Sequence, residues 1–249
     1  SAPVPVLTGS ALGAVRYLAP RLDGGAFYIA ETRFSSRQTV GVATVNPTTL
    51  AVEASVTVEL PVSDEFITHV VAGGTGTVYL VSVPAGRVFA VDPATGAILN
   101  TFGIRPSSTG NGGFVGVYVF ITPDGSRLIR AGWDVIESVA LTGPTPGVTA
   151  TLPVGTETFF AVDGAGRLYT AEIRDRTVRG FDSATLTSTG NFLVGEPTDQ
   201  GIFGLWGASD GVYVETSSPG PGGEASRLGR YTADGARLGV WPAVTSPQN

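Results

Sequence analysis

A repeated pattern of short strand-forming runs constrains the fold of this chain more than any other feature. The stretch from Thr158 to Val194 contains four such runs, at 158–162, 167–172, 176–182 and 188–194. Residues that favour β-strands dominate each run, and Asp, Gly and Ser mark the turns between the runs. The stretch therefore predicts a four-stranded antiparallel sheet made from consecutive strands.

The same pattern recurs along the rest of the chain. Val78 to Gly103 repeats the second to fourth runs, Ala26 to Leu60 repeats them again, and weaker copies occupy 115–154 and 202–244. The turn before the fourth run recurs at spacings of 40 to 51 residues, close to the ~40 to 50 residues of a four-stranded β-propeller blade. The repeats therefore predict an all-β β-propeller.

We expect a single domain in which five four-stranded antiparallel blades close into a ring. The expected blades are residues 14–60, 66–103, 115–154, 157–194 and 202–244. Residues 1–13 are a candidate for a strand that closes the ring by pairing with the last blade, which would protect an exposed sheet edge. Six blades is the alternative, because the stretch before Ala26 has room for part of another blade.

Two phrases resemble a known class of propeller repeat. AVDGAGRLYTAE at 161–172 and VFAVDPATGAIL at 88–99 are similar to the NHL and YVTN-type repeats. The resemblance covers most of the chain. It implies architecture alone, since proteins built from those repeats bind or transform many unrelated molecules.

Composition excludes several classes of function. The net charge is −6, the pI is about 4.8 and no basic cluster occurs, which argues against a nucleic-acid surface and against binding to anionic lipid. There is no Cys, so disulfides and thiolate metal sites are unavailable. Every uncharged stretch is interrupted by polar residues, Gly or Pro, which argues against a membrane span.

The residue usage also bears on origin and location. All 15 basic residues are Arg, a bias expected of a GC-rich, bacterial genome. The sequence begins at Ser1 and contains no Met, as expected of an exported protein whose leader has been removed. We therefore expect an extracytoplasmic protein that is periplasmic, secreted or held at the cell surface.

Propeller geometry predicts where a binding site would form. The starts of the first strands, the ends of the second strands and the links between second and third strands share one face, around the mouth of the central channel. Six ligand-binding candidates fall there: Glu31, His69, Tyr118, Trp133, Asp134 and Glu172. The single His excludes a His-rich metal centre, and we expect no metal, cofactor or catalytic residue.

Each of these candidates also has a structural interpretation. His69 is a candidate for a structural hydrogen bond. Glu31 and Glu172 occupy matched repeat positions, where a carboxylate would bond to turn amides. The tryptophans at 133 and 206 are expected to pack, although Trp133 precedes Asp134 in an expected loop, which favours exposure.

The repeats make two further structural predictions. The tyrosines of the second strands, Tyr28, Tyr79, Tyr169 and Tyr213, share one repeat position and are expected to be buried between adjacent blades. Two turn-rich stretches, IRPSSTGNGG at 104–113 and SSPGPGG at 217–223, are expected to be recognition loops on a rigid scaffold.

No enzyme signature stands out. The sequence contains no G-x-S-x-G elbow, H-E-x-x-H motif, P-loop or dinucleotide-binding fingerprint. We therefore expect a non-catalytic binding or scaffolding propeller that engages a protein partner, or a larger envelope or surface assembly, through its loops. A hydrolase or lyase of lactonase or glycosidase type, acting at the channel mouth, is the first alternative and a lectin is the second. The sequence does not specify a small-molecule ligand.

Overall fold

A computed structural model shows five four-stranded antiparallel sheets, each made from consecutive strands. It describes residues 15–21, 27–33, 39–61, 67–74, 76–106, 117–132, 134–142, 146–155, 158–220 and 223–242, and these residues include no helix. Each sheet is one blade, so the predicted β-propeller with five blades is confirmed. No segment in these ranges forms a helix that could cross a membrane.

The strands follow the repeats of the sequence. The first sheet contains β1 (Val15–Pro20), β2 (Phe27–Arg33), β3 (Thr39–Val45) and β4 (Val52–Glu59). The second contains β5 (His69–Ala72), β6 (Val78–Ser82), β7 (Arg87–Val91) and β8 (Ile98–Gly103). The third contains β9 (Tyr118–Ile121), β10 (Arg127–Ala131), β11 (Val135–Ala140) and β12 (Gly147–Pro153). The fourth contains β13 (Thr158–Val162), β14 (Leu168–Glu172), β15 (Thr177–Phe181) and β16 (Ser188–Leu193). The fifth contains β17 (Gly201–Gly207), β18 (Gly211–Gly220), β19 (Gly223–Thr232) and β20 (Arg237–Pro242).

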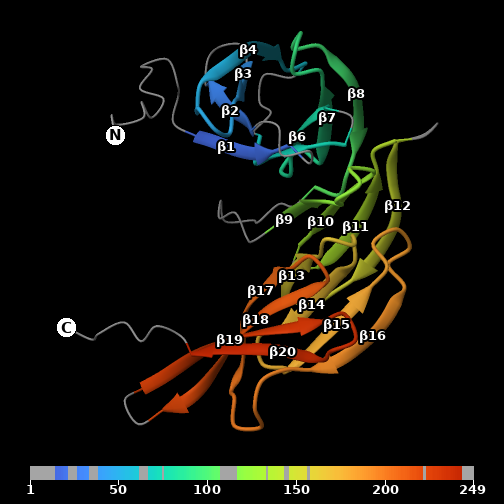
Figure 1. Cartoon of the computed structure of the whole chain (residues 1–249). Helices are drawn as coiled ribbons and strands as arrows, with labels where there is room; N and C mark the ends of the chain where they lie inside the picture. Colours follow the sequence, from blue (N-terminus) through green and yellow to red (C-terminus); the bar gives the residue numbers. More distant parts are fainter. Residues whose placement is uncertain are drawn as a thin grey trace.

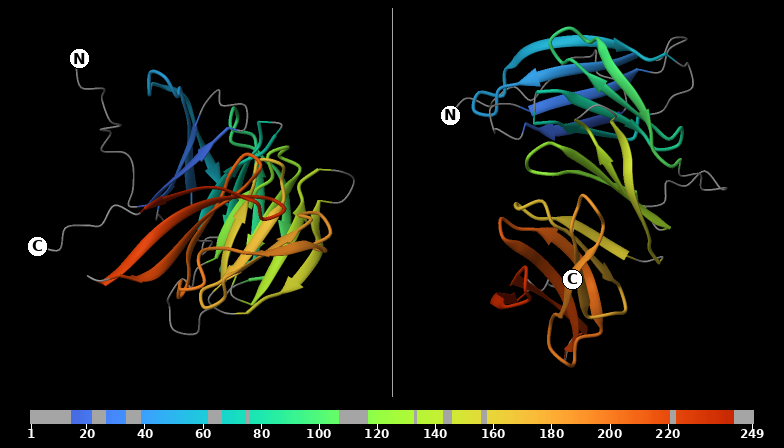
Figure 2. Two further views of the ribbon diagram at one scale, coloured as in Figure 1. Left: turned by 60° about the horizontal axis from the view of Figure 1, so that its bottom comes forward. Right: turned by 90° about the vertical axis from the view of Figure 1, so that its right-hand side faces the viewer.

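The sheets pack face to face in an arc that follows the order of the chain. The first strands β1, β5, β9, β13 and β17 lie along the inside of the arc, each against the next. Figure 1 and the right-hand view of Figure 2 place the first and fifth sheets at opposite ends of the arc. The described strands of these two sheets share none of the substantial contacts that join neighbouring sheets. The ring is therefore open among the described residues, and the closed ring that we expected is not seen. The expected closing strand at 1–13 lies outside the described residues.

A turn with a side-chain cap joins the third and fourth strands in three of the blades. Asp182 Oδ1 accepts hydrogen bonds from the amides of Ala184 and Thr185, at 3.0 and 2.8 Å. Asn46 and Asp92 make the equivalent bonds to the amides two residues ahead. Such side chains mimic a backbone turn, which is why these residue types mark the repeat in the sequence.

The last residue of this turn has a left-handed backbone. Gly96 has φ of 76°, while Leu50 and Leu186 have φ of 56° and 55°. A residue with a Cβ is strained in this region, whereas Gly adopts it freely. The two leucines therefore keep the turn geometry at a cost in stability that Gly96 avoids.

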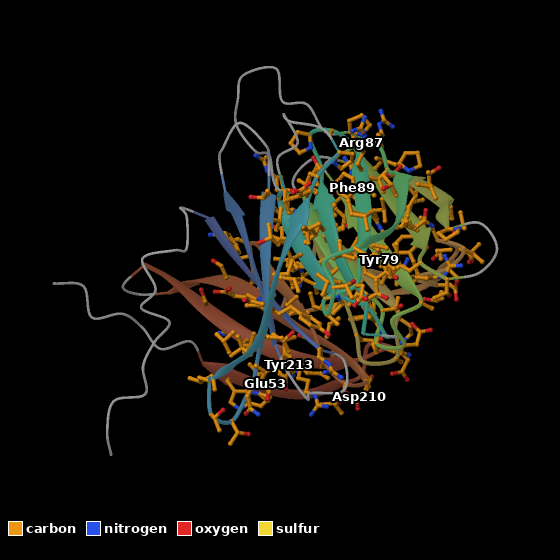
Figure 3. The ribbon with its side chains drawn as sticks, turned by 90° about the horizontal axis from the view of Figure 1, so that it is seen from above. Glu53, Tyr79, Arg87, Phe89, Asp210 and Tyr213 are labelled. Carbon is orange, nitrogen blue, oxygen red and sulfur yellow. The ribbon has the colours of Figure 1, made fainter. Side chains whose placement is uncertain are left out.

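The core consists of apolar layers between neighbouring sheets. Each sheet has a leading face, which points toward the next sheet along the chain, and a trailing face, which points toward the previous one. In the second sheet, Phe89 packs on the trailing face with the first sheet, and Tyr79 packs on the leading face with the third (Figure 3). Both faces of an internal sheet are thus apolar, which explains the low charge content.

The tyrosines of the second strands test this arrangement. Tyr28, Tyr79 and Tyr169 are buried, with 3%, 3% and 1% of their surface exposed, as predicted. Tyr213 is only half-buried, so the prediction was wrong for the fifth blade. Trp206, expected to pack, is 50% exposed. Both differences have the same cause, because no described sheet covers the leading face of the fifth sheet.

The expected loop at 217–223 is instead part of a long hairpin. β18 and β19 remain paired as far as Gly220 opposite Gly223. β17 begins opposite Ser217 and β20 ends opposite Arg227. The two strands therefore continue as a two-stranded ribbon beyond the rest of the fifth sheet (Figure 1). Of the expected loop at 104–113, only the first residues, up to Pro106, are described.

Candidate functional site

The six predicted site residues fall on several blades. Glu31 lies in β2, and the description of it is limited to its backbone. Trp133, between β10 and β11, lies outside the described residues. His69 begins β5, Tyr118 begins β9 and Glu172 ends β14. His69, Tyr118 and Glu172 therefore lie at strand ends, as expected. The contacts of the individual side chains show what each residue can do.

His69 is held between the second and third blades. Its Nδ1 lies 3.0 Å from Thr68 Oγ1, and the Thr68 hydroxyl donates to the Val81 carbonyl at 3.1 Å. Burial lowers the pKa of His69, and a hydrogen bond to the Val117 backbone opposes this shift. The imidazole is therefore neutral at pH 7 and joins β5 to the segment that precedes β9. These contacts support the structural interpretation of His69.

Glu172 forms an exposed ion pair. Arg179 Nη1 donates to Glu172 Oε1 at 2.8 Å, and both side chains are 45% exposed. Arg179 also lies 3.5 Å from Asp175. The carboxylate therefore binds a guanidinium, and the expectation that it would bond to turn amides was wrong for Glu172. Exposed pairs of this kind contribute about 0 to 1 kcal/mol to stability.

Tyr118 belongs to an aromatic group between the third and fourth blades. Its ring is stacked nearly parallel to Phe120, with centroids 6.1 Å apart, and tilted toward Phe160 at 5.7 Å. The side chain remains 40% exposed. It is thus anchored by packing on one side and accessible on the other, an arrangement that suits contact with a ligand.

Sequence reasoning missed a buried ion pair next to Asp134. Arg130 in β10 is fully buried, and Glu137 opposite it in β11 is 5% exposed. Arg130 Nε lies 3.6 Å from Glu137 Oε2. The amide of Arg105 donates to both Glu137 oxygens, at 3.0 and 2.9 Å, and the Arg105 side chain lies 3.4 Å from Asp134. Asp134 is therefore engaged with the segment that follows the second blade.

Burial has the largest effect on the pKa of Arg130 in this cluster. Burial lowers the pKa of Arg130, while the charges of Glu137 and Asp134 raise it. The Nε of Arg130 has no hydrogen-bond partner within the described part of the chain. Charged residues are almost never fully buried unless paired, and such groups mark candidate functional sites. The signal in the sequence was a charged residue in each of two adjacent apolar strands, at 130 and 137.

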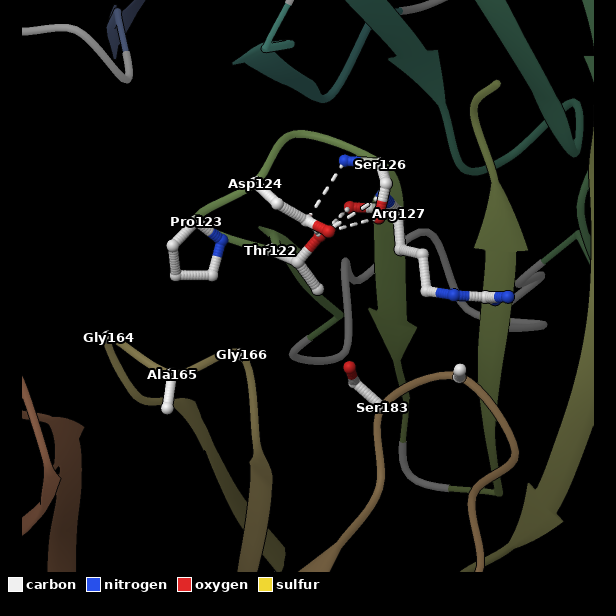
Figure 4. A pocket seen from close by; sticks show the side chains of 10 residues that line it. Thr122, Pro123, Asp124, Ser126, Arg127, Gly164, Ala165, Gly166 and Ser183 are labelled. Carbon is white, nitrogen blue, oxygen red and sulfur yellow. Dashed lines mark hydrogen bonds between the residues drawn. The ribbon is translucent and has the colours of Figure 1, made fainter. Parts of the chain in front are cut away.

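A cavity of about 270 Å³ lies between the third and fourth blades, on the side of the hairpin turns. The turns at 122–127 and 164–166 line it together with Ser183 and Ala184 (Figure 4). The polar groups around it bond to one another. Asp124 accepts from the Ser126 amide at 3.1 Å, and Arg127 Nη1 donates to Ser138 Oγ at 2.8 Å. None of the six predicted residues lines this cavity.

The described residues therefore do not assemble the predicted candidates into one reactive centre. His69 contacts Thr68, Glu172 binds Arg179, and Asp134 lies beside Arg105. No group of three or more His, Cys, Asp or Glu side chains within the described ranges could hold a metal ion.

The fold and these contacts define the class of the protein as a β-propeller. No family model matches the sequence, and no curated protein matches it. Solved structures do match. A candidate 6-phosphogluconolactonase from Bacteroides uniformis has a TM-score of 0.59 at 18% identity, over 97% of this chain and 76% of that one.

Two further similar structures carry different names. A streptogramin B lyase has a TM-score of 0.55 at 13% identity, over 96% of this chain and 72% of that one. The hydrazine synthase of Kuenenia stuttgartiensis has a TM-score of 0.57 at 12% identity, over 96% and 69%. These similarities support a propeller architecture and do not single out NHL or YVTN-type repeats. At such identities they show the fold alone.

Proposed function

We propose that this protein is a binding or scaffolding propeller that engages a protein partner through the ribbon of β18 and β19. The carrying observation is that Ser218–Gly220 and Gly223–Ser226 pair with each other and with no other described strand. Their outer edges carry backbone carbonyls and, except at Pro219, backbone amides that pair with no described strand. Such edges bind an added strand from another protein.

The contacts elsewhere support the same function. Of the polar candidates on the predicted face, His69, Asp134 and Glu172 have internal partners, so they are poorly placed to transfer protons to a substrate. A partner that adds a strand needs only backbone groups, and the ribbon supplies them with one charged residue, Glu224. The ribbon also overlaps residues 217–223, one of the two stretches that the sequence predicts to be recognition loops.

Crosslinking from the ribbon tests this proposal. A photoreactive residue placed at Ser218 or Ala225 is expected to crosslink one partner in extracts of the producing cells, identified by mass spectrometry. The matched control carries the same group at Asn191 in β16, an exposed strand of the fourth sheet. A second variant joins Ser217 to Ser226 through Asn-Gly, which removes both labelling positions. Its capture of the identified partner is therefore measured by co-purification, and we expect this capture to be lost while the circular dichroism stays the same. Equal capture by all three proteins would contradict the proposal.

The proposal also places the protein outside the cytoplasm, within an envelope or surface assembly. The low charge content, 14% of the residues, favours an exterior shielded by neighbouring proteins. Fractionation of the producing cells with an antibody against the chain tests this location. Recovery in the cytoplasmic fraction would contradict it.

A second candidate is a hydrolase or lyase, favoured by the buried Arg130–Glu137 pair beside Asp134. A buried guanidinium whose Nε has no hydrogen-bond partner among the described residues could stabilise negative charge that develops on a substrate oxygen. Sugar lactones are a reasonable first substrate class, since one similar structure is a candidate lactonase. Hydrolysis that is lost in Glu137→Gln, with folding intact, would favour this candidate over the binding proposal.

A further inference from the structure

The leading face of the fifth sheet is an exposed aromatic surface. Trp206 in β17 and Trp241 in β20 are 50% and 48% exposed, and Tyr213 in β18 is half-buried between them. The rings of Tyr213 and Trp241 are 6.1 Å apart. Exposed aromatic clusters of this kind mark interaction sites.

This surface matches faces that are covered elsewhere in the chain. Strand register places Tyr213 at the position of Tyr79, and Trp241 at the position of Phe102. Tyr79 and Phe102 also form an aromatic pair, with centroids 6.5 Å apart. They are only 3% and 9% exposed because the third sheet packs over them. The aromatic pair of the fifth sheet lacks only the covering sheet.

The chain also has one trailing face that no described sheet covers, on the first sheet. Residues that alternate with the buried Val40, Val42 and Val58 lie on this face of β3 and β4. They include the small Gly41, Ala43, Ser55 and Thr57 and, at one edge, the exposed Glu59. Ser55 and Thr57 are exposed, and Gly41 and Ala43 are half-buried. Small residues leave room for the two indole rings of an opposing surface.

An ion pair borders the aromatic surface. Arg230 in β19 lies over the Tyr213 ring at 5.9 Å, and its Nη2 is 2.8 Å from Asp210. The equivalent positions in the second and fourth sheets are Ala90 and Gly180. Trp, Tyr and Arg are the residues enriched at the energetic centres of protein interfaces. The surface therefore has the composition of an interface and the repeat pattern of a blade junction.

We propose that the leading face of the fifth sheet binds the trailing face of the first sheet in a second copy of this chain. Among the described residues, the trailing face of every other sheet is occupied by the preceding sheet, and no sheet covers that of the first. The two free faces lie at opposite ends of the arc (Figure 1), so they are positioned to meet in different molecules. The contact is heterologous and extends beyond a dimer unless it closes into a ring.

Analytical ultracentrifugation of designed variants tests this contact. The wild-type chain is expected to increase in mass above the monomer as its concentration rises. Trp206→Asp removes the aromatic surface, and Ala43→Arg blocks the opposing face. Each variant is expected to need at least a ~10-fold higher concentration to associate, as for interface centres in general. Leu193→Asp is the matched control, because Leu193 is 68% exposed on β16, away from both faces, and its association should be unchanged.

Mixing the two variants makes the test specific. Each keeps one intact face, so an equimolar mixture should form dimers and nothing larger. A wild-type chain that stays monomeric would overturn the proposal. Quenching of tryptophan fluorescence would then distinguish two explanations. Weak quenching would indicate that the ring closes within one molecule and shields Trp206 and Trp241. Strong quenching would indicate an exposed face that binds a different protein. The chain shortened between Ser217 and Ser226 should still associate, so failure here and failure of the ribbon proposal are distinguishable.

Discussion

Replacing one partner of the buried Arg130–Glu137 pair should destabilise the protein strongly. In Glu137→Leu, the guanidinium of Arg130 remains fully buried without its counter-ion, and the Arg105 amide loses the two oxygens that accept from it at 3.0 and 2.9 Å. Breaking a buried pair from one side costs about 3 to 5 kcal/mol. For a chain of this length that corresponds to a decrease in Tm of roughly 6 to 20 °C.

The double substitution Arg130→Met with Glu137→Leu tests whether the two buried charges compensate each other. It removes both charges and retains side chains of similar volume, so it should be within about 1 to 2 kcal/mol of the wild type. Urea unfolding followed by circular dichroism measures the four proteins of the cycle. The exposed pair Arg179–Glu172 is the control, and Glu172→Gln should change stability by less than about 1 kcal/mol. Additive losses at 130 and 137 would refute the reasoning, because they would show that the two charges do not compensate each other.

Three further predictions concern single positions. Tyr79→Ala should cost about 3 to 5 kcal/mol in urea unfolding, whereas Tyr213→Ala, on the uncovered face, should cost about 1 to 2 kcal/mol; equal losses would show that the fifth sheet is covered. Because burial lowers the pKa of His69 below 6.5, the unfolded chain binds the proton more readily. Stability should therefore be highest above pH 6.5 and fall as the pH decreases toward the lowered pKa, and His69→Gln should flatten this part of the profile. Leu50→Gly should raise the Tm slightly, because Leu50 has φ of 56° and is 43% exposed and the strain that it relieves is roughly 1 kcal/mol; a lower Tm would show that its packing outweighs the strain.

The similar structures illustrate why the fold leaves the function open. They include a candidate lactonase, a streptogramin B lyase and a hydrazine synthase, so one architecture carries unrelated chemistry. In this chain, the features for which we propose a function are the buried pair in the third blade and the ribbon of the fifth.

The sequence by itself was sufficient to predict the blades, because the residues that define each strand and turn lie close together in the sequence. Short runs of residues that favour β-structure define each strand. A capped turn such as that at Asp182 ends the third strand within a few residues of the side chain that caps it. Packing at the leading faces was also predictable for Tyr28, Tyr79 and Tyr169, since their repeat positions place them under the next sheet.

Only the tertiary structure decided what covers each face and which side chains meet. Tyr213 has the same local sequence context as Tyr79, but its burial depends on whether another sheet follows, which no local pattern records. The partners of His69 and Glu137 lie on segments far away in the sequence, at Val117 and Arg105. Such contacts depend on how the blades pack against one another, and single-strand patterns carry no information about that packing.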